Sequence, residues 1–248
     1  MKIIGMIHLD TLPGFKEHKS MDYVKKKALK DMNALIEGGV DGILVENTED
    51  HPHTEKLNEE TVRAFTQIAK EIVKKTQIPI GICPLWNDYT AGLRIAIESW
   101  ASFIRVPVFV DKFKTDAGII TGNADDVISF RKKIGAEHIK LMTDIHVKHA
   151  VMLNKREIED SAKEALEKGA DELIITGKMT GDAPKINDLK RVRKAFPNAK
   201  IAVGSGTTPK NIKEIMKYAD TAIVGTYLKT NNVIDVKKVK EIMKLARG

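Results

Sequence analysis

Three carboxylate side chains stand where short apolar segments end, and they could carry acid–base chemistry. Glu46, Asp88 and Asp144 each end or follow such a segment. Carboxyl groups that meet at one site can supply both a general acid and a general base. We therefore predict these three residues as the candidate catalytic groups. Two competing interpretations stay open: helix capping, which Asp favours, and neutralisation of Arg105.

Two glycine-rich turns in the last quarter of the chain favour an anion site. The first reads Gly204-Ser205-Gly206 and is followed by Thr207-Thr208-Pro209, and the second contains Gly225-Thr226. Glycine lets backbone amides approach a ligand closely, and a helix that begins near Pro209 adds unpaired N–H groups. The sequence predicts phosphate binding by Gly204, Ser205, Gly206, Gly225 and Thr226. The alternative is two tight turns that need glycine for their backbone conformation.

Further polar residues at segment ends are predicted to contact a substrate. Arg105 lies within an apolar segment, where a lone charge is costly, so it needs Glu46 or a substrate anion as its partner. Lys140 could bind phosphate or form a Schiff base, or it could reach solvent from a strand edge. The complete predicted substrate-binding set is His8, Asn47, Asn87, Arg105, Lys140, His149, Thr176 and Gly177.

The pair His51-Pro52-His53 superficially resembles a metal-binding motif. Both histidines stand in a polar segment without an obvious third ligand. We therefore expect no dedicated metal site, and no other residue pattern implies a cofactor.

Eight short apolar runs must position these residues. They span 3–8, 42–46, 78–83, 102–106, 138–142, 172–176, 200–204 and 221–225, and amphipathic segments such as 21–37, 59–75 and 157–168 separate them. Strands that alternate with helices form parallel sheets. With 248 residues and no linker, the chain is predicted to be a single (β/α)8 TIM barrel over residues 1–248. Strands 7 and 8 are where such barrels commonly bind phosphate.

A weak repeat sets the register of the even-numbered strands. Ile43, Ile104, Leu173 and Ala222 align, and so do Val45, Val106, Ile175 and Val224. These two columns are predicted to face the helices. Strand side chains alternate in direction, so Glu46 and Arg105 are predicted to point into the barrel. The segment 112–123 is predicted to be a long polar loop, which is either a lid or a passive surface loop.

Composition limits the class of protein. Hydrophobic residues make up 42% and charged residues 30%, and the net charge is +7. The basic residues are scattered along predicted helices, which indicates solvated faces and no nucleic-acid partner. No apolar run is long enough to span a membrane. Cys83 is the only cysteine, so a cytoplasmic location is the default expectation. Richness in Lys, Glu and Ile hints at a thermophilic source, and a homo-oligomer stays open.

The chain resembles the BtpA family, also called BtpA/SgcQ, almost from end to end. The motifs that carry the resemblance are Gly5-Met6-Ile7-His8-Leu9, Leu12-Pro13-Gly14, Val45-Glu46-Asn47, Asn87-Asp88, Phe103-Ile104-Arg105-Val106, Asp144, Lys148-His149-Ala150, Thr176-Gly177, Gly204-Ser205-Gly206 and Val224-Gly225-Thr226.

The resemblance implies two kinds of function. One branch of the family is named for photosystem I biogenesis, and another lies among sugar-metabolism genes and is labelled a nucleosidase. The main hypothesis is an enzyme that acts on a phosphorylated sugar or nucleotide-like metabolite by isomerase, lyase or nucleosidase-like chemistry. The alternatives are a non-catalytic assembly or stability factor, and a phosphoribosyl- or prenyl-phosphate enzyme of the broader phosphate-binding barrels.

Overall fold

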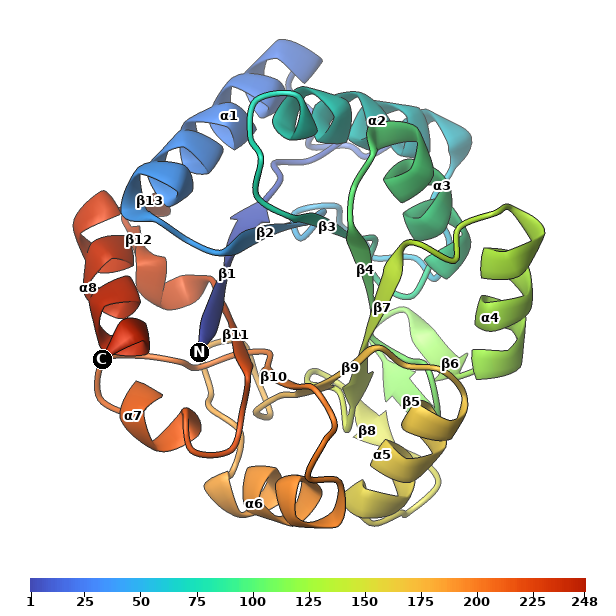
Figure 1. Ribbon diagram of the computed structural model, residues 1–248. Coiled ribbons are helices and arrows are strands. Elements are labelled where there is room, and N and C mark those ends of the chain that lie inside the picture. The colour runs from blue at the N-terminus through green and yellow to red at the C-terminus, as the bar shows by residue number, and fades with distance from the viewer.

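Eight parallel strands close into a barrel in a computed structural model that describes residues 1–248. Neighbouring strands around the ring follow the order β1-β11-β10-β9-β7-β4-β3-β2, and helices surround them (Figure 1). The eight strands are β1 (Lys2–His8), β2 (Gly42–Glu46), β3 (Ile80–Cys83), β4 (Phe103–Val106), β7 (Lys140–Ile145), β9 (Glu172–Ile175), β10 (Ile201–Val203) and β11 (Thr221–Val224). All eight predicted strands are therefore confirmed.

Eight α-helices and one short 3-10 helix follow or connect the strands. They are α1 (Met21–Gly38), α2 (Glu59–Val73), α3 (Tyr89–Ser99), α4 (Ala124–Lys133), α5 (Ile158–Glu167), α6 (Ile186–Ala195), α7 (Ile212–Ile215), η1 (Thr226–Leu228) and α8 (Val236–Arg247). Helix α1 begins where the Ser20 side chain accepts the amide of Tyr23, and it ends at Gly39 with φ 86°. These caps satisfy terminal backbone groups that a helix leaves unpaired.

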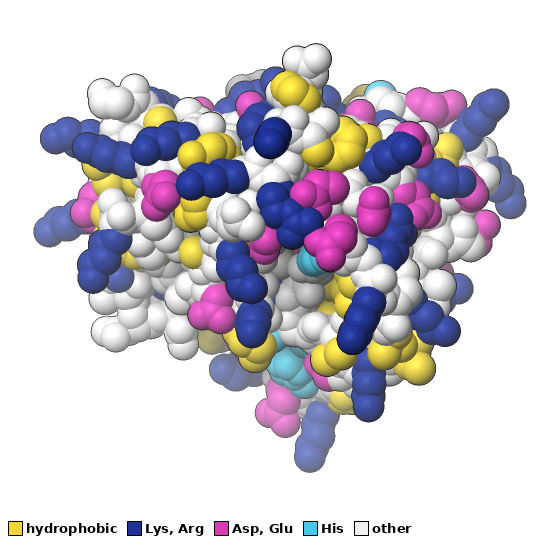
Figure 2. All heavy atoms as spheres, turned by 90° about the horizontal axis from the view of Figure 1, so that it is seen from below, with side chains coloured by type: hydrophobic (Ala, Val, Ile, Leu, Met, Phe, Trp, Pro, Cys, Tyr) yellow, Lys and Arg dark blue, Asp and Glu magenta, His cyan; other side chains and the backbone are white.

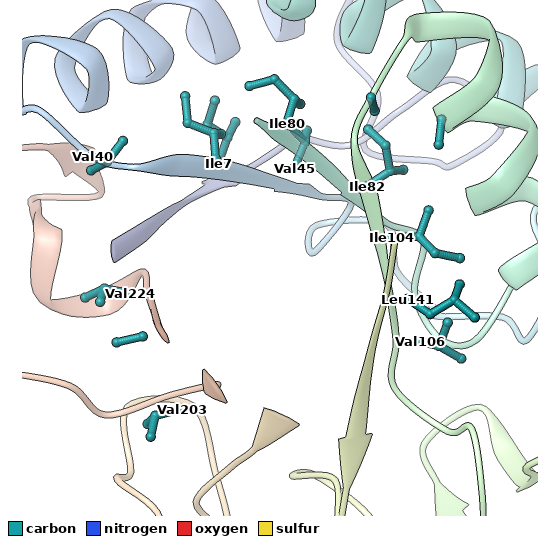
Figure 3. Close-up of a cluster of buried hydrophobic side chains, with 14 of the residues drawn as sticks. Ile7, Val40, Val45, Ile80, Ile82, Ile104, Val106, Leu141, Val203 and Val224 are labelled. Atoms are coloured by element: carbon teal, nitrogen blue, oxygen red, sulfur yellow. The ribbon is translucent and has the colours of Figure 1, made fainter. Parts of the chain in front are cut away.

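The main hydrophobic core lies between the barrel and the helices. Both predicted columns belong to it, and Ile104, Val106 and Val224 project outward from the barrel wall in Figure 3. A second, smaller cluster fills the barrel interior and contains Ile4, Met6, Leu44, Cys83, Phe103, Met142, Ile174, Ala202 and Ile223. The alternation read from the repeat therefore describes both faces of the strands correctly.

An aspartate directly precedes each of the strands β2, β9 and β11, and its side chain has a structural role. Asp41 accepts the amide of Ile3, Asp171 accepts that of Leu141, and Asp220 accepts that of Ile201, each at 2.8 or 2.9 Å. Each of these amides belongs to the first or second residue of a neighbouring barrel strand, and the aspartate supplies the acceptor that a backbone carbonyl does not. The aspartates thus align adjacent strands at the amino-terminal end of the barrel.

The segment predicted as a long loop after β4 is instead an antiparallel hairpin. Strands β5 (Lys112–Thr115) and β6 (Gly118–Thr121) pair, and β8 (Val151–Met152) adds a third strand. A small core beneath this sheet contains Trp86, Val108, Phe113, Ile120 and Val147. A further hairpin, β12 (Lys229–Thr230) with β13 (Val233–Ile234), follows η1.

Replacement of Gly81 by alanine is expected to destabilise the barrel interior. A Cβ at this position would lie 2.0 Å from Cε2 of Phe103, which is the paired residue on β4. Overpacking of this kind costs about 1–3 kcal/mol in the free energy of unfolding. Denaturant unfolding should show that loss, and Phe103→Leu in the Gly81→Ala background should recover part of it. If Phe103→Leu adds its own loss in full, the two residues do not compete for this space.

Charged side chains of both signs cover the surface. In Figure 2, Lys and Arg side chains are spread over the face in view, with Asp and Glu between them. No helix has the length and apolar character needed to cross a membrane.

Candidate functional site

An inner cavity of about 230 Å³ lies at the carboxyl ends of the barrel strands. Glu46, His8 and Arg105 line it on one side. The turns after β10 and β11, residues 204–208 and 225–227, line the other side. Glu46 is its only carboxylate, and Arg105, Lys148 and His8 are the other ionisable side chains apart from Tyr227.

Arg105 lies inside the barrel, as the strand register predicts. Its Nε and Nη2 atoms donate to the two carboxylate oxygens of Asp144, each at 2.8 Å. Its Nη1 atom lies 3.5 Å from Oε2 of Glu46. The side chains of Arg105 and Asp144 are 3% and 0% exposed, so this is a buried bidentate ion pair. Asp144 is thereby committed to holding Arg105, and it does not line the cavity.

Glu46 is held ionised at the barrel mouth. Burial raises the pKa of its carboxyl group, but Arg105, His8 and Lys148 outweigh burial and lower the pKa below its ordinary value. Thr48 donates to Oε1 of Glu46 at 3.0 Å. The carboxylate therefore meets the cavity as an anion that can accept a proton.

Lys148 joins the site from the segment after β7, and the sequence did not single it out as a site residue. Its Nζ donates to Oγ1 of Thr180 at 3.3 Å and forms no salt bridge. Burial and the nearby Arg105 lower the pKa of its ammonium group, while Glu46 opposes them. In the sequence, Lys148 belongs to the family motif Lys148-His149-Ala150 and lies four residues after Asp144, but neither signal reveals the direction of its side chain.

His8 lines the same cavity and is paired with a lysine. Nζ of Lys229 lies 2.6 Å from Nδ1 of His8, and the other ring nitrogen has no partner within the protein. Burial lowers the pKa of His8 to about 4, with Glu46 opposing the shift and Lys229 adding to it. His8 is thus a neutral imidazole that accepts a hydrogen bond from Lys229.

Four loop amides at the inner cavity have no acceptor in the protein. The backbone N–H groups of Ser205, Gly206, Thr207 and Gly225 donate to neither backbone nor side chain, whereas that of Gly204 donates to Ile175. Packing also contributes to the choice of glycine: a Cβ on Gly206 (φ 68°) would lie 2.0 Å from the amide nitrogen of Ala183, and one on Gly204 would lie 2.6 Å from Thr176. These turns are therefore both tight and rich in free donors.

The turn after β10 is tied to the segment after β9. Oγ of Ser205 accepts the amide of Gly177 at 3.1 Å and donates to the carbonyl oxygen of Asp182 at 2.7 Å. Oγ1 of Thr176 donates to the carbonyl oxygen of His146 at 3.4 Å. Thr226 lines the inner cavity as the first residue of η1.

An outer cavity of about 1020 Å³ adjoins the inner one and shares Glu46, Arg105, Lys148 and Thr180 with it. Part of its wall is apolar and is formed by Trp86, which follows β3, together with Phe113 of β5 and Met152 of β8. His149 lies here, and its Nε2 accepts the amide of Thr180 at 3.1 Å. The outer cavity therefore combines a polar floor with an apolar wall.

Three predicted residues take part in the framework of the mouth and line neither cavity. Asp88 caps α3 by accepting the amide of Ala91, and it also accepts the amide of Leu57. Asn87 exchanges two hydrogen bonds with the backbone of Val108. Asn47 donates to Asp50 and accepts the amide of Leu85. Helix capping and loop bracing thus account for all three side chains.

Lys140 is separated from the other predicted residues. It begins β7, is exposed, and lines a different cavity together with residues that start the barrel strands, such as Lys2 and Gly42. This cavity lies at the amino-terminal end of the barrel, opposite Glu46. Lys140, Met142 and Asp144 do alternate along β7 as the sequence predicts. Lys140 is the first residue of the strand, however, so it lies at the opposite end of the barrel from Asp144.

Comparison with known proteins identifies the family. The sequence model of the BtpA family matches residues 1–248. The chain belongs to the BtpA family. This BtpA-family chain is 37% identical over 249 residues to an uncharacterized protein of the thermophilic archaeon Pyrococcus furiosus, covering 98% of this chain and 94% of that protein.

Two relatives with names are more distant. The photosystem I biogenesis protein BtpA of Synechocystis is 33% identical over 236 residues, which is 94% of this chain and 82% of that protein. The sgc region protein SgcQ of Escherichia coli is 30% identical over 249 residues, which is 97% of this chain and 92% of that protein.

Solved structures with the same fold include two enzymes of Pyrococcus furiosus. N-(5'-phosphoribosyl)anthranilate isomerase has a TM-score of 0.63 at 13% identity, covering 100% of this chain and 99% of the other. Thiamine phosphate pyrophosphorylase has a TM-score of 0.62 at 14% identity, covering 99% and 95%. At such identities the BtpA-family chain shares with them the TIM-barrel fold alone.

Proposed function

We propose that this BtpA-family protein is an enzyme that acts on a phosphorylated sugar or nucleotide-like metabolite by acid–base chemistry. The observation that carries the proposal is one cavity that combines unpaired amides with an ionised carboxylate. The amides of Ser205, Gly206 and Gly225 would receive the phosphate, together with Gly204 and Thr226 of the same turns. Glu46 would exchange the proton.

The charges of the site agree with an anionic substrate. Asp144 neutralises Arg105, so Lys148 remains without a salt-bridge partner beside the free amides. The ordinary phosphate monoester carries about two negative charges, which the amides and Lys148 would stabilise. The outer cavity is large enough for the remainder of a sugar phosphate or a nucleotide and offers it an apolar wall.

Inorganic phosphate is expected to bind this site, and Lys148→Met is expected to weaken its affinity about tenfold, because a charge-assisted hydrogen bond contributes about 1.5–3 kcal/mol. Lys140→Met is the matched control, because it removes the same charge at the opposite end of the barrel. Isothermal titration would measure both affinities.

The two variants separate local binding from a general effect of charge. If Lys148→Met and Lys140→Met lower the affinity for phosphate equally, the effect comes from the overall charge of the protein and not from a local contact. That result would contradict the proposed site. Absence of phosphate binding by the unaltered protein, or binding that leaves the amides of Ser205, Gly206 and Gly225 unshifted in NMR spectra, would contradict it as well.

A further inference from the structure

The inner cavity contains only one carboxylate, Glu46, and this restricts which of the acid–base reactions named above it can catalyse. Asp144 is paired through both oxygens with Arg105, and Asp88 caps α3. Glycosidic cleavage generally uses two carboxyl groups, one on either side of the bond that breaks. Glu46 has no such second carboxyl group in the cavity. Within the inner cavity, the partner of Glu46 is therefore a group of another kind.

His8 occupies the position that such a partner needs. It is the register partner of Glu46 on the neighbouring strand, and both side chains line the inner cavity. His8 also adjoins the glycine turn after β11, because a Cβ on Gly225 would lie 3.1 Å from Cε1 of its ring. A ligand held by that turn would thus be within reach of both His8 and Glu46.

Lys229 determines which ring nitrogen of His8 carries the proton. An ammonium group can only donate, so its contact of 2.6 Å makes Nδ1 of His8 the acceptor. The proton of the neutral ring is then on Nε2, the nitrogen that has no partner in the protein. Lys229 comes from β12, directly after η1; burial lowers the pKa of its ammonium group, and the charge of Asp31 opposes this shift.

We propose that His8 is a neutral electrophile whose Nε2–H donates to a carbonyl oxygen of the phosphorylated substrate, and that Lys229 is the residue that positions it. The inference rests on the proposed function and selects one reaction class from it. That class is proton transfer between the two carbons of an α-hydroxycarbonyl phosphate, as in the interconversion of an aldose and a ketose phosphate.

The step balances without a further reactant. The carboxylate of Glu46 takes a proton from the carbon that bears the hydroxyl group, and the electron pair of that C–H bond moves toward the carbonyl oxygen. The Nε2–H of His8 stabilises the negative charge that develops on this oxygen. Glu46 then returns the proton to the neighbouring carbon. The proton of the original hydroxyl group passes through Nε2 of His8 to the former carbonyl oxygen, so that the hydroxyl and carbonyl groups exchange places. A neutral imidazole paired with a glutamate base near bound phosphate is an established way to perform such a step.

The surroundings of His8 favour the neutral ring. The charged groups that face it are Glu46 from β2, Lys229 from β12, Lys148 from the segment after β7 and Lys27 from α1. Three of these four are cations, and burial adds to their effect, so the ring resists protonation. Lys27 is itself paired with Asp10 at 2.6 Å, which leaves Lys229 as the cation in direct contact.

Long-range ¹H–¹⁵N NMR of His8 between pH 5 and pH 8 tests the positioning role without any substrate. We expect a neutral ring protonated at Nε2 throughout this range, in accord with a pKa of about 4. In Lys229→Met the pKa should rise and both tautomers should be populated, whereas Lys229→Arg should retain the Nε2–H tautomer. Protonation of Nδ1 in the unaltered protein, or a midpoint near the ordinary 6.5, would overturn the inference even if Lys229→Met fails to fold.

Binding of 2-phosphoglycolate compared with inorganic phosphate tests the reaction class. The planar carboxylate of this probe imitates the oxygen on which charge develops, so we expect it to bind at least ten times more tightly than phosphate. This ratio should fall toward one in Lys229→Met and be retained in Lys229→Arg. If phosphate binds but the ratio is one in the unaltered protein, this inference is wrong and the proposed function survives. If neither probe binds, the proposed function itself fails.

Discussion

Replacement of Glu46 by glutamine should lower turnover of a phosphorylated substrate by about a hundredfold or more, the usual size of a lost acid–base contribution. Glutamine preserves the shape of the side chain but cannot exchange a proton. Binding of phosphate should persist, because the free amides of Ser205 and Gly225 do not depend on Glu46. The measurements are steady-state kinetics and phosphate titration of the same variant.

Asp88→Asn is the matched control for this experiment, since it makes the same chemical change at a residue that caps α3. Asparagine is also a good N-cap residue, so turnover should change by no more than a few fold. Full turnover in Glu46→Gln, or an equally large loss in Asp88→Asn, would show that Glu46 is not the group that exchanges the proton.

Replacement of Asp144 by alanine should produce the largest loss of stability. It would leave Arg105 buried with only the weaker contact to Glu46, whose Oε2 lies 3.5 Å from Nη1. Removal of one member of a buried ion pair costs about 3–5 kcal/mol. In a protein of this size, such a loss lowers Tm by roughly 6–20 °C. Arg105 cannot escape the cost by losing its proton, because a guanidinium group remains charged in proteins even without an acidic partner.

Asp125→Ala provides the comparison for burial. Asp125 lies 2.8 Å from Lys168, the same separation as in the pair of Arg105 with Asp144, but its side chain is 72% exposed. Water already solvates both partners there, so no measurable change in Tm is expected. Similar shifts in Tm for Asp125→Ala and Asp144→Ala would contradict the importance assigned to burial.

The barrel and the direction of Arg105 could be predicted because both depend on local alternation. Side chains of a strand point to opposite faces in turn, so Ile104 and Val106 toward the helices require Arg105 toward the interior. Its main partner could not be predicted in the same way. Strand β4 pairs with β7, which carries Asp144, whereas β2 with Glu46 lies beyond β3. The partner follows from the order of strands around the ring, which the repeat does not contain.

The site residues Lys148 and Lys229 could not be predicted for a related reason. Each lies outside the barrel strands, where no periodic pattern states which way a side chain points. Asp88 and Asn87 show the opposite case: polar residues after a strand can be fully used in helix capping and loop hydrogen bonds. Residue type and spacing predict which residues lie at the mouth of the barrel. Which of their side chains line the cavity depends on contacts between segments that are distant in the sequence.

Thermal unfolding of the protein with matched pairs of ligands tests the central proposal most directly. Each pair would contain a phosphorylated sugar or nucleotide and the same compound without its phosphate. We expect at least one phosphorylated member to raise Tm while its partner does not, because only the former can use the amides of Ser205, Gly206 and Gly225. That compound should then be converted by the unaltered protein. If no phosphorylated compound raises Tm, and the protein instead binds another protein stably, the enzyme proposal is contradicted in favour of an assembly factor.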